Sequence, residues 1–310
     1  MRISRLIGAV LFALSCAENM AAQSNPPQAT PPVSPVTVSA TIYITAATKK
    51  GILVTDLKPE DLAIMEDKVP AKIEQVSCGR DEPILVGILV DVSGSRRIDT
   101  HLSSHYDALV SFLDSLLTAD DATYLAAFDD KIYKLSEVMT DRAAISEAFD
   151  KLRKHEPHGS TALYDAVKAV AEANFFGRKG RRVLVVVGDW EDNTSHITMY
   201  KAAEAPQRSS TTIYALVDDE FGASKKAHKL AMSAAVRITE ETGGLAYDVH
   251  EKEDFGKALR AIGGAVVGSC RVEYTTTGNA GAKKGTKLHV EASSKDVSIL
   301  YPRVRFSSAQ

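Results

Sequence analysis

The chain has 310 residues, of which 45% are hydrophobic and 25% are charged, and its formal net charge is -3 at pH 7. This composition is typical of a globular protein with one large domain or two smaller ones. It excludes the strongly basic surface that nucleic-acid binding requires, and the short basic run at 178–182 is interpreted as a solvated face.

The first residues have the pattern of a secretory signal peptide. A basic start precedes an apolar stretch at residues 6–14, which is too short and too early for a mature membrane span. We expect residues 1–23 to be a signal peptide, cleaved after Ala17 or near Ala22, and the mature chain to have no transmembrane segment. The protein is then exported to the periplasm or the extracellular space. As an alternative, Cys16 could be lipidated and anchor the chain.

A Pro-rich, polar stretch at residues 24–36 predicts an extended linker. It is followed by three short segments with strand-forming residues between turn signals, at 37–46, 62–65 and 71–76.

Between residues 81 and 268, apolar strands alternate with amphipathic helices. The predicted strands are 84–90, 122–128, 132–135, 183–187, 212–217 and 245–247. The predicted helices are 98–116, 141–153, 161–176, 196–207, 225–242 and 255–266. This alternation predicts an α/β fold, with a doubly wound, mostly parallel sheet covered by helices on both faces.

The strand pattern returns after Cys270, in segments 271–276, 288–292 and 297–306. Because these strands lack crossover helices, we expect them to pair with the N-terminal strands. Residues 37–80 and 269–310 would then form a small β-sandwich-like domain from both chain ends, with the α/β domain, residues 81–268, inserted in it.

Two cysteines remain in the mature chain, Cys78 and Cys270, and they flank the predicted insertion. Paired cysteines in an exported protein are more often bridged than free. We therefore expect a Cys78–Cys270 disulfide, although two unrelated small buried residues are the alternative.

Hydroxyl and carboxylate side chains follow the apolar strands of the α/β region. Asp91, Ser93 and Ser95 come directly after the first strand, Thr161 lies at a helix start, and Asp189 follows the strand at 183–187. Ligands bind where parallel strands end, so these three segments could converge. Their hard oxygen atoms suit Mg²⁺, Mn²⁺ or Ca²⁺ rather than Zn²⁺. Each motif alone is weak, because a Ser or Thr at a helix start is more often only a cap.

Together, the five residues resemble the metal-ion-dependent adhesion site of von Willebrand factor type A domains. The resemblance covers residues 82–268. The segment 62–67 and the C-terminal strands resemble an exported bacterial subfamily that is well represented in acidobacteria. The resemblance implies that Ser93, Ser95 and Thr161 bind a divalent ion directly, with Mg²⁺ preferred over Mn²⁺ or Ca²⁺. It implies that Asp91 and Asp189 act mainly through water or hydrogen bonds.

One coordination position would stay open for an Asp or Glu carboxylate of a protein or surface ligand. Family members often have Met after the D-x-S-x-S motif and Gly after the second Asp, whereas this chain has Arg96 and Trp190. We expect Arg96, Trp190 and His158 at the rim, in contact with the partner, although Trp190 could equally pack on the sheet and His158 could be structural.

The leading hypothesis is therefore an exported, metal-dependent binding protein of the adhesion type. The alternative is a metal-dependent hydrolase of the cell envelope. We do not expect an enzyme, because the chain has no G-x-S-x-G motif, no histidine placed as a base and no phosphate-binding glycine loop.

Overall fold

The structure is a computed structural model, and it describes residues 37–99, 101–218, 224–249, 252–277 and 285–306. The predicted signal peptide, residues 1–23, the Pro-rich linker, residues 24–36, and Cys16 lie outside the described residues. Within these ranges, no helix is long and apolar enough to cross a membrane.

A six-stranded sheet forms the centre of the α/β region, in the order β6-β5-β4-β7-β8-β9. Its strands are β4 (Ile84–Asp91), β5 (Ala122–Phe128), β6 (Ile132–Lys134), β7 (Arg181–Gly188), β8 (Thr211–Val217) and β9 (Ala246–Asp248). All neighbours are parallel except β6, which is antiparallel to β5. Every residue of β4 is buried, which explains its continuous apolar sequence, because both faces of a parallel sheet are covered.

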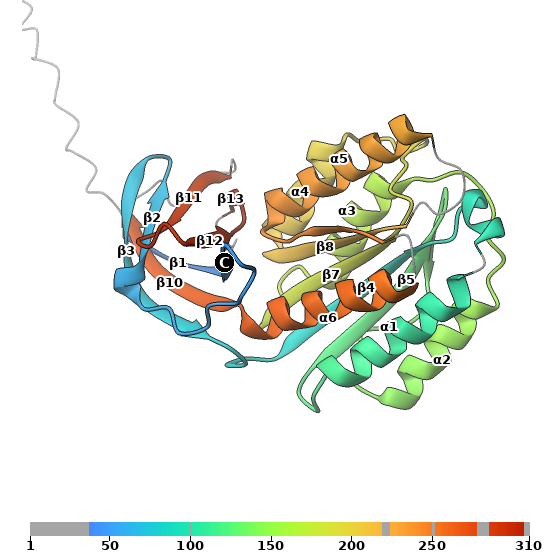
Figure 1. Cartoon of the computed structure of the whole chain (residues 1–310), viewed down its shortest axis with the longest axis horizontal. Coiled ribbons are helices and arrows are strands. Elements are labelled where there is room, and N and C mark those ends of the chain that lie inside the picture. Colours follow the sequence, from blue (N-terminus) through green and yellow to red (C-terminus); the bar gives the residue numbers. More distant parts are fainter. Residues whose placement is uncertain (1–36, 100, 219–223, 250–251, 278–284, 307–310) are drawn as a thin grey trace, which may run out of the picture. The chain divides into compact units, whose positions relative to one another are not determined.

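Helices cover both faces of this sheet, as Figure 1 shows. One apolar core joins the sheet to α1 (Leu102–Leu116), α2 (Arg142–Arg153) and α6 (Lys252–Gly268). A second core joins the opposite face to α3 (Leu163–Asn174), α4 (Met199–Arg208) and α5 (Lys225–Thr242). The prediction of a doubly wound α/β fold is confirmed.

Strands from the two ends of the chain form a second, antiparallel sheet. It is one curled sheet with the order β12-β1-β10-β3-β2-β11-β13. Its strands are β1 (Thr37–Thr48), β2 (Leu62–Glu66), β3 (Val69–Cys78), β10 (Cys270–Thr277), β11 (Thr286–Ala292), β12 (Val297–Leu300) and β13 (Val304–Arg305). The C-terminal β10 lies between the N-terminal strands β1 and β3, so the predicted pairing of the two chain ends is confirmed. The domain boundaries themselves stay a prediction.

The segment 297–306 differs from the single strand that its sequence predicts. It forms β12, which pairs with β1, and β13, which pairs with β11. These partners lie near opposite ends of the strand order, so the chain has to leave one before it reaches the other. Pro302 lies in the break between the two strands, where it removes no sheet hydrogen bond.

The predicted disulfide is present and joins Cys78 to Cys270. The two cysteines are directly opposed in the antiparallel pair of β3 and β10. Cys78 ends the last strand before the α/β region, and Cys270 begins the first strand after it. The bond therefore connects the points at which the chain leaves and re-enters the antiparallel sheet.

Candidate metal site

The predicted ligands lie where the central strands β4 and β7 end side by side. These strands are parallel neighbours, with Val90 opposite Val187. The loop that begins at Asp91 therefore emerges next to Asp189, although the two residues are far apart in the sequence. The carboxyl edge of a parallel sheet is the usual place for a ligand site.

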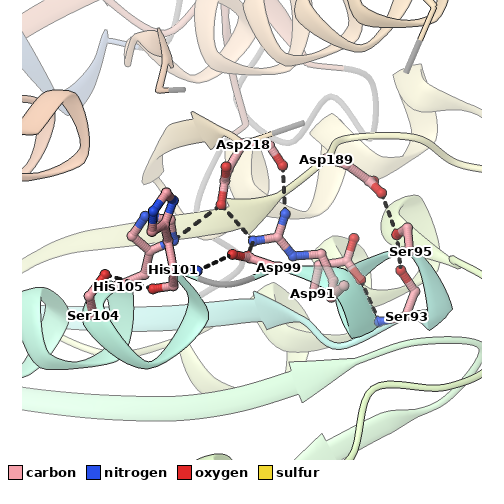
Figure 2. Close-up of polar contacts among 10 residues, drawn as sticks. Asp91, Ser93, Ser95, Asp99, His101, Ser104, His105, Asp189 and Asp218 are labelled. Carbon is pink, nitrogen blue, oxygen red and sulfur yellow. Dashed lines mark hydrogen bonds and ion pairs between the residues drawn. The ribbon is translucent and has the colours of Figure 1, made fainter. Parts of the chain in front are cut away.

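Hydrogen bonds connect four of the five predicted ligands into one chain, shown in Figure 2. The Ser95 hydroxyl donates to Asp189 Oδ2 at 2.6 Å. The hydroxyl oxygens of Ser93 and Ser95 are 3.1 Å apart, and the Ser93 amide donates to Asp91 Oδ1 at 2.8 Å. Ser95 is exposed, whereas Ser93, Asp91 and Asp189 are buried, so the cluster opens to solvent on the Ser95 side.

Thr161 lies in a segment that is bonded to both of these loops. The amide of Gly94 donates to the carbonyl of Gly159 at 3.1 Å. The amide of Thr161 donates to Asn193 Oδ1 at 2.9 Å, and the Asn193 amide donates back to the Thr161 carbonyl at 3.0 Å. The Thr161 side chain is buried, and α3 begins only at Leu163, so Thr161 belongs to the connecting loop. The three predicted segments therefore lie together. Asn193, which no sequence motif indicated, holds the Thr161 segment in place through two hydrogen bonds.

The electrostatics of this cluster fit a cation. Asp91 is 1% exposed, and its Oδ2 is a buried oxygen with no hydrogen-bond partner among the described residues. Burial, together with the negative charge of Asp189, raises the pKa of Asp91 to about 7. A divalent ion would offset both effects, because it supplies positive charge to two acidic groups that repel each other. Carboxylate and hydroxyl oxygens are donors that suit hard divalent ions.

Gly188, the last residue of β7, gives Asp91 the space to occupy this position. A Cβ atom at Gly188 would lie 2.4 Å from the Asp91 Cβ and 2.9 Å from its Oδ2. The close approach of β7 to the acidic side chain therefore requires glycine at the strand end.

The sequence of this region matches a known domain type: residues 86–191 fit the family model of the von Willebrand factor type A domain. This chain contains a von Willebrand factor type A domain. The match includes all five predicted ligands. The finer assignment to an exported acidobacterial subfamily stays a prediction.

Solved structures share the fold of this chain. A von Willebrand factor type A protein from Catenulispora acidiphila is 11% identical, with a TM-score of 0.52, and the match covers 88% of this chain and 74% of that one. Proximal thread matrix protein 1 from the mussel byssus is 16% identical, with a TM-score of 0.52. In that structure its metal-ion-dependent adhesion site is occupied by zinc. That match covers 63% of this chain and 49% of the mussel protein. At these identities the likeness shows the fold alone, and no curated protein matches the sequence.

Arg96 does not lie at the exposed rim of the candidate metal site, and the prediction that it contacts a partner there is wrong. Its side chain is 4% exposed and forms ion pairs with Asp99 and Asp218, whose side chains are 0% exposed. It also donates to the carbonyl of Asp218 at 2.6 Å. In Figure 2, Asp99 and Asp218 are drawn to the left of Asp91, and Ser95 is drawn to its right.

Trp190 does not lie at the rim either, and the alternative that it packs on the sheet is confirmed. It is 2% exposed and belongs to the core between the sheet and α3, α4 and α5. Its backbone has a φ of 58°. That is the left-handed region, which glycine adopts most easily and which agrees with the glycine expected here from the resemblance. The large side chain turns into the core instead of toward a partner. His158 is exposed, and its contact with a partner stays a prediction.

Proposed function

We propose that this protein binds a divalent cation through Asp91, Ser93, Ser95, Thr161 and Asp189, and that the bound ion recruits an acidic group of a partner. The observation that carries the proposal is the buried, unpartnered Oδ2 of Asp91, next to the exposed end of a carboxylate–hydroxyl chain. Mg²⁺ fits these hard oxygen donors best, with Mn²⁺ or Ca²⁺ as alternatives.

The proposed partner is a protein or surface ligand that presents an Asp or Glu carboxylate. The hydroxyl ligands are neutral, so the ion would keep much of its charge for a further acidic oxygen. Ser95 is exposed at the cluster, which gives such a group access. Metal and partner would then bind in a linked way, each increasing the affinity of the other.

We further infer an exported binding protein rather than an enzyme. The basic and apolar start of the chain supports export, as does the Cys78–Cys270 bond, because disulfides persist in oxidising compartments. Against a serine hydrolase, the described hydroxyls of Ser93 and Ser95 contact each other and Asp189, with no histidine base among these contacts.

The experiment is a calorimetric titration of Mg²⁺, Mn²⁺ and Ca²⁺ into the full chain, alone and with a peptide that carries a single Glu. We expect Thr161→Ala and Ser95→Ala to weaken metal binding by at least about tenfold, since even the loss of a group that only orients a ligand costs about 10–100-fold. Peptide binding should require the metal and should disappear on chelation.

Ser160→Ala is the matched control, because Ser160 is exposed and directly precedes Thr161. It should bind metal and peptide as the unchanged protein does. Equal affinities for Thr161→Ala, Ser95→Ala and Ser160→Ala would overturn the metal site. Chelator-sensitive turnover in a hydrolase screen would instead favour a metal-dependent hydrolase of the cell envelope.

A further inference from the structure

Asp129 is a buried carboxylate without a basic side chain to balance its charge. It follows β5 directly and is 0% exposed. In the part of the chain that the structure describes, its ion-pair contact is to a histidine, His158, and to no lysine or arginine. Its Oδ1 accepts from the Lys131 amide at 2.7 Å, and its Oδ2 accepts from the Tyr133 hydroxyl at 2.9 Å. The carboxylate is thus firmly oriented but not neutralised.

Two histidines after the end of α2 complete a group around this carboxylate. One ligand atom from each of Asp129, His155 and His158 lies within 4.8 Å of the other two. His158 Nδ1 is 3.5 Å from Asp129 Oδ2, and the rings of His155 and His158 have centroids 5.4 Å apart. His155 Nε2 is a buried nitrogen with no hydrogen-bond partner among the described residues.

The contact between His158 and Asp129 is close to the distance between neighbouring ligand atoms of a tetrahedral zinc ion. Bonds of about 2.0–2.1 Å to nitrogen and oxygen place neighbouring ligand atoms roughly 3.3 Å apart. The 3.5 Å between His158 Nδ1 and Asp129 Oδ2 is nearly this edge. Binding would exchange the present contact of His158 Nδ1 with the carbonyl of Glu156, at 3.0 Å, for a metal bond. The Tyr133 hydroxyl, which donates to Asp129 Oδ2 and lies 3.5 Å from His158 Nε2, would orient both ligands, as groups around metal ligands do.

A second acid–histidine group among the described residues shows the contrast. Asp99, His105 and Asp218 satisfy the same distance limit. However, the Arg96 guanidinium already pairs with both of these carboxylates. Their charge is balanced by protein, whereas the charge of Asp129 is not.

We propose that Asp129, His155 and His158 form a second metal site, which binds a divalent transition metal such as Zn²⁺. It is separate from the oxygen-only site at Ser93 and Ser95, and it does not depend on the proposed function. Two imidazoles and one carboxylate favour zinc over Mg²⁺ or Ca²⁺. The His158 side chain is 48% exposed, so the ion can enter and a water molecule can complete its shell.

The site would brace the segment that carries Thr161. The His158 amide donates to the carbonyl of Val92 at 2.9 Å, and the Ala162 amide donates to the carbonyl of Asp129 at 2.8 Å. The proposed second ion would therefore hold both ends of residues 158–162.

The test is a zinc titration of the untagged full chain in excess Mg²⁺, which occupies oxygen ligands but does not compete for imidazole. We expect one zinc equivalent to bind, and His158→Gln to weaken its binding by at least about tenfold. His158 is exposed, so this variant should fold normally, and a circular dichroism melt without metal checks this. His289→Gln, at an exposed histidine that contacts Glu291, is the matched control and should bind zinc unchanged.

A second arm separates the two sites. Ser93→Ala/Ser95→Ala should retain zinc binding in excess Mg²⁺. Failure of the unchanged protein to bind zinc would overturn the proposal, and so would equal zinc affinity of the unchanged protein and His158→Gln. Loss of zinc binding in the serine variant, with His158→Gln unaffected, would assign the zinc to the oxygen site and also overturn it.

Discussion

Arg96 is a buried cation behind the loop of the candidate metal site. It pairs with Asp99 and Asp218, and His105 Nδ1 lies 3.2 Å from the same Asp218 carboxylate. The His105 ring in turn stacks on Phe255 of α6, with centroids 4.1 Å apart. Removal of one member of such a buried pair leaves the other charges uncompensated, which costs far more than the pair contributes on balance.

We expect Arg96→Met to lower the free energy of unfolding by about 3–5 kcal/mol, because two buried carboxylates lose their cation. Chemical denaturation measures this. The neighbouring Arg97→Met is the control, because Arg97 is exposed and contacts the carbonyl of Pro157. It should change stability by less than about 0.5 kcal/mol. Similar losses in both variants would show that Arg96 has no special structural role.

At the scale of single residues, the sequence predicts where the candidate ligands lie better than it predicts which residues surround them. Asp91, Ser93 and Ser95 follow a recognisable strand, so their placement depends only on short-range pattern. Arg96 gives no such signal, because its partner Asp218 is 122 residues away. The same limit applies to His155 and His158. Their sequence spacing does not reveal that they lie next to Asp129, which is more than 25 residues earlier in the chain, directly after β5.

Asp121, which directly precedes β5, connects the start of β4, the end of α1 and the linker at Arg80, at the sheet edge opposite the candidate metal site. Its buried carboxylate accepts from the amide of Ile84 at the start of β4 and from the amide of Thr118 after α1, both at 2.7 Å. It also accepts from Arg80 at 2.6 Å. Burial raises the pKa of Asp121, but the hydrogen bonds from Thr118, Arg80 and Ile84 outweigh it and hold the pKa below its usual value.

The lowered pKa of Asp121 has a definite pH consequence. The ionised carboxylate stabilises the fold above its unfolded-state pKa of about 3.9, and this contribution is lost as the pH falls through the lower folded-state value. We expect Asp121→Asn to lower the free energy of unfolding by about 2–4 kcal/mol at pH 7, since hydrogen bonds to a charged group contribute about 1.5–3 kcal/mol each.

Urea unfolding of Asp121→Asn and the unchanged protein across the acid range measures this difference, which should shrink below about pH 4. The exposed neighbour gives the control, Asp120→Asn, which should behave as the unchanged protein at every pH. A difference that stays constant into strong acid would contradict the proposed role of the charge.

Elements with a strong local pattern are the ones that the sequence predicts best. The strand at 122–128 and the helix at 225–242 have the bounds that apolar pattern and the Gly243 stop signal indicate, and Gly243 indeed adopts a φ of 83°. The prediction fails at 297–306, where β12 and β13 follow different partners. Which strands this segment pairs with depends on long-range packing, and the local sequence does not indicate it.

At the scale of the whole molecule, the disulfide links the N-terminal and C-terminal parts of the antiparallel sheet. The disulfide closes a loop with a sequence separation of 192, and both cysteines lie inside the antiparallel sheet. The sequence predicts this link from the export signal and the positions of two cysteines. It does not predict that β10 inserts between β1 and β3, because strand order in an antiparallel sheet follows from long-range packing.

We expect Cys78→Ala/Cys270→Ala to lower the free energy of unfolding by about 2–5 kcal/mol, because the unfolded chain gains the freedom that the bond removes. Guanidinium denaturation with and without a reducing agent measures the change. The reducing agent should destabilise the unchanged protein and leave the double variant unaffected. An unchanged midpoint after reduction would show that the bond contributes nothing to folding.

The position of the Cys78–Cys270 bond also decides how the chain would respond to a mechanical load. Tension applied between residues 37 and 306 would pass from β3 through the sulfur atoms into β10. Residues 79–269 would lie outside this path and would stay slack while the outer strands are pulled. An oxidised molecule tethered at both ends could thus be stretched while its ion-binding loops keep their shape.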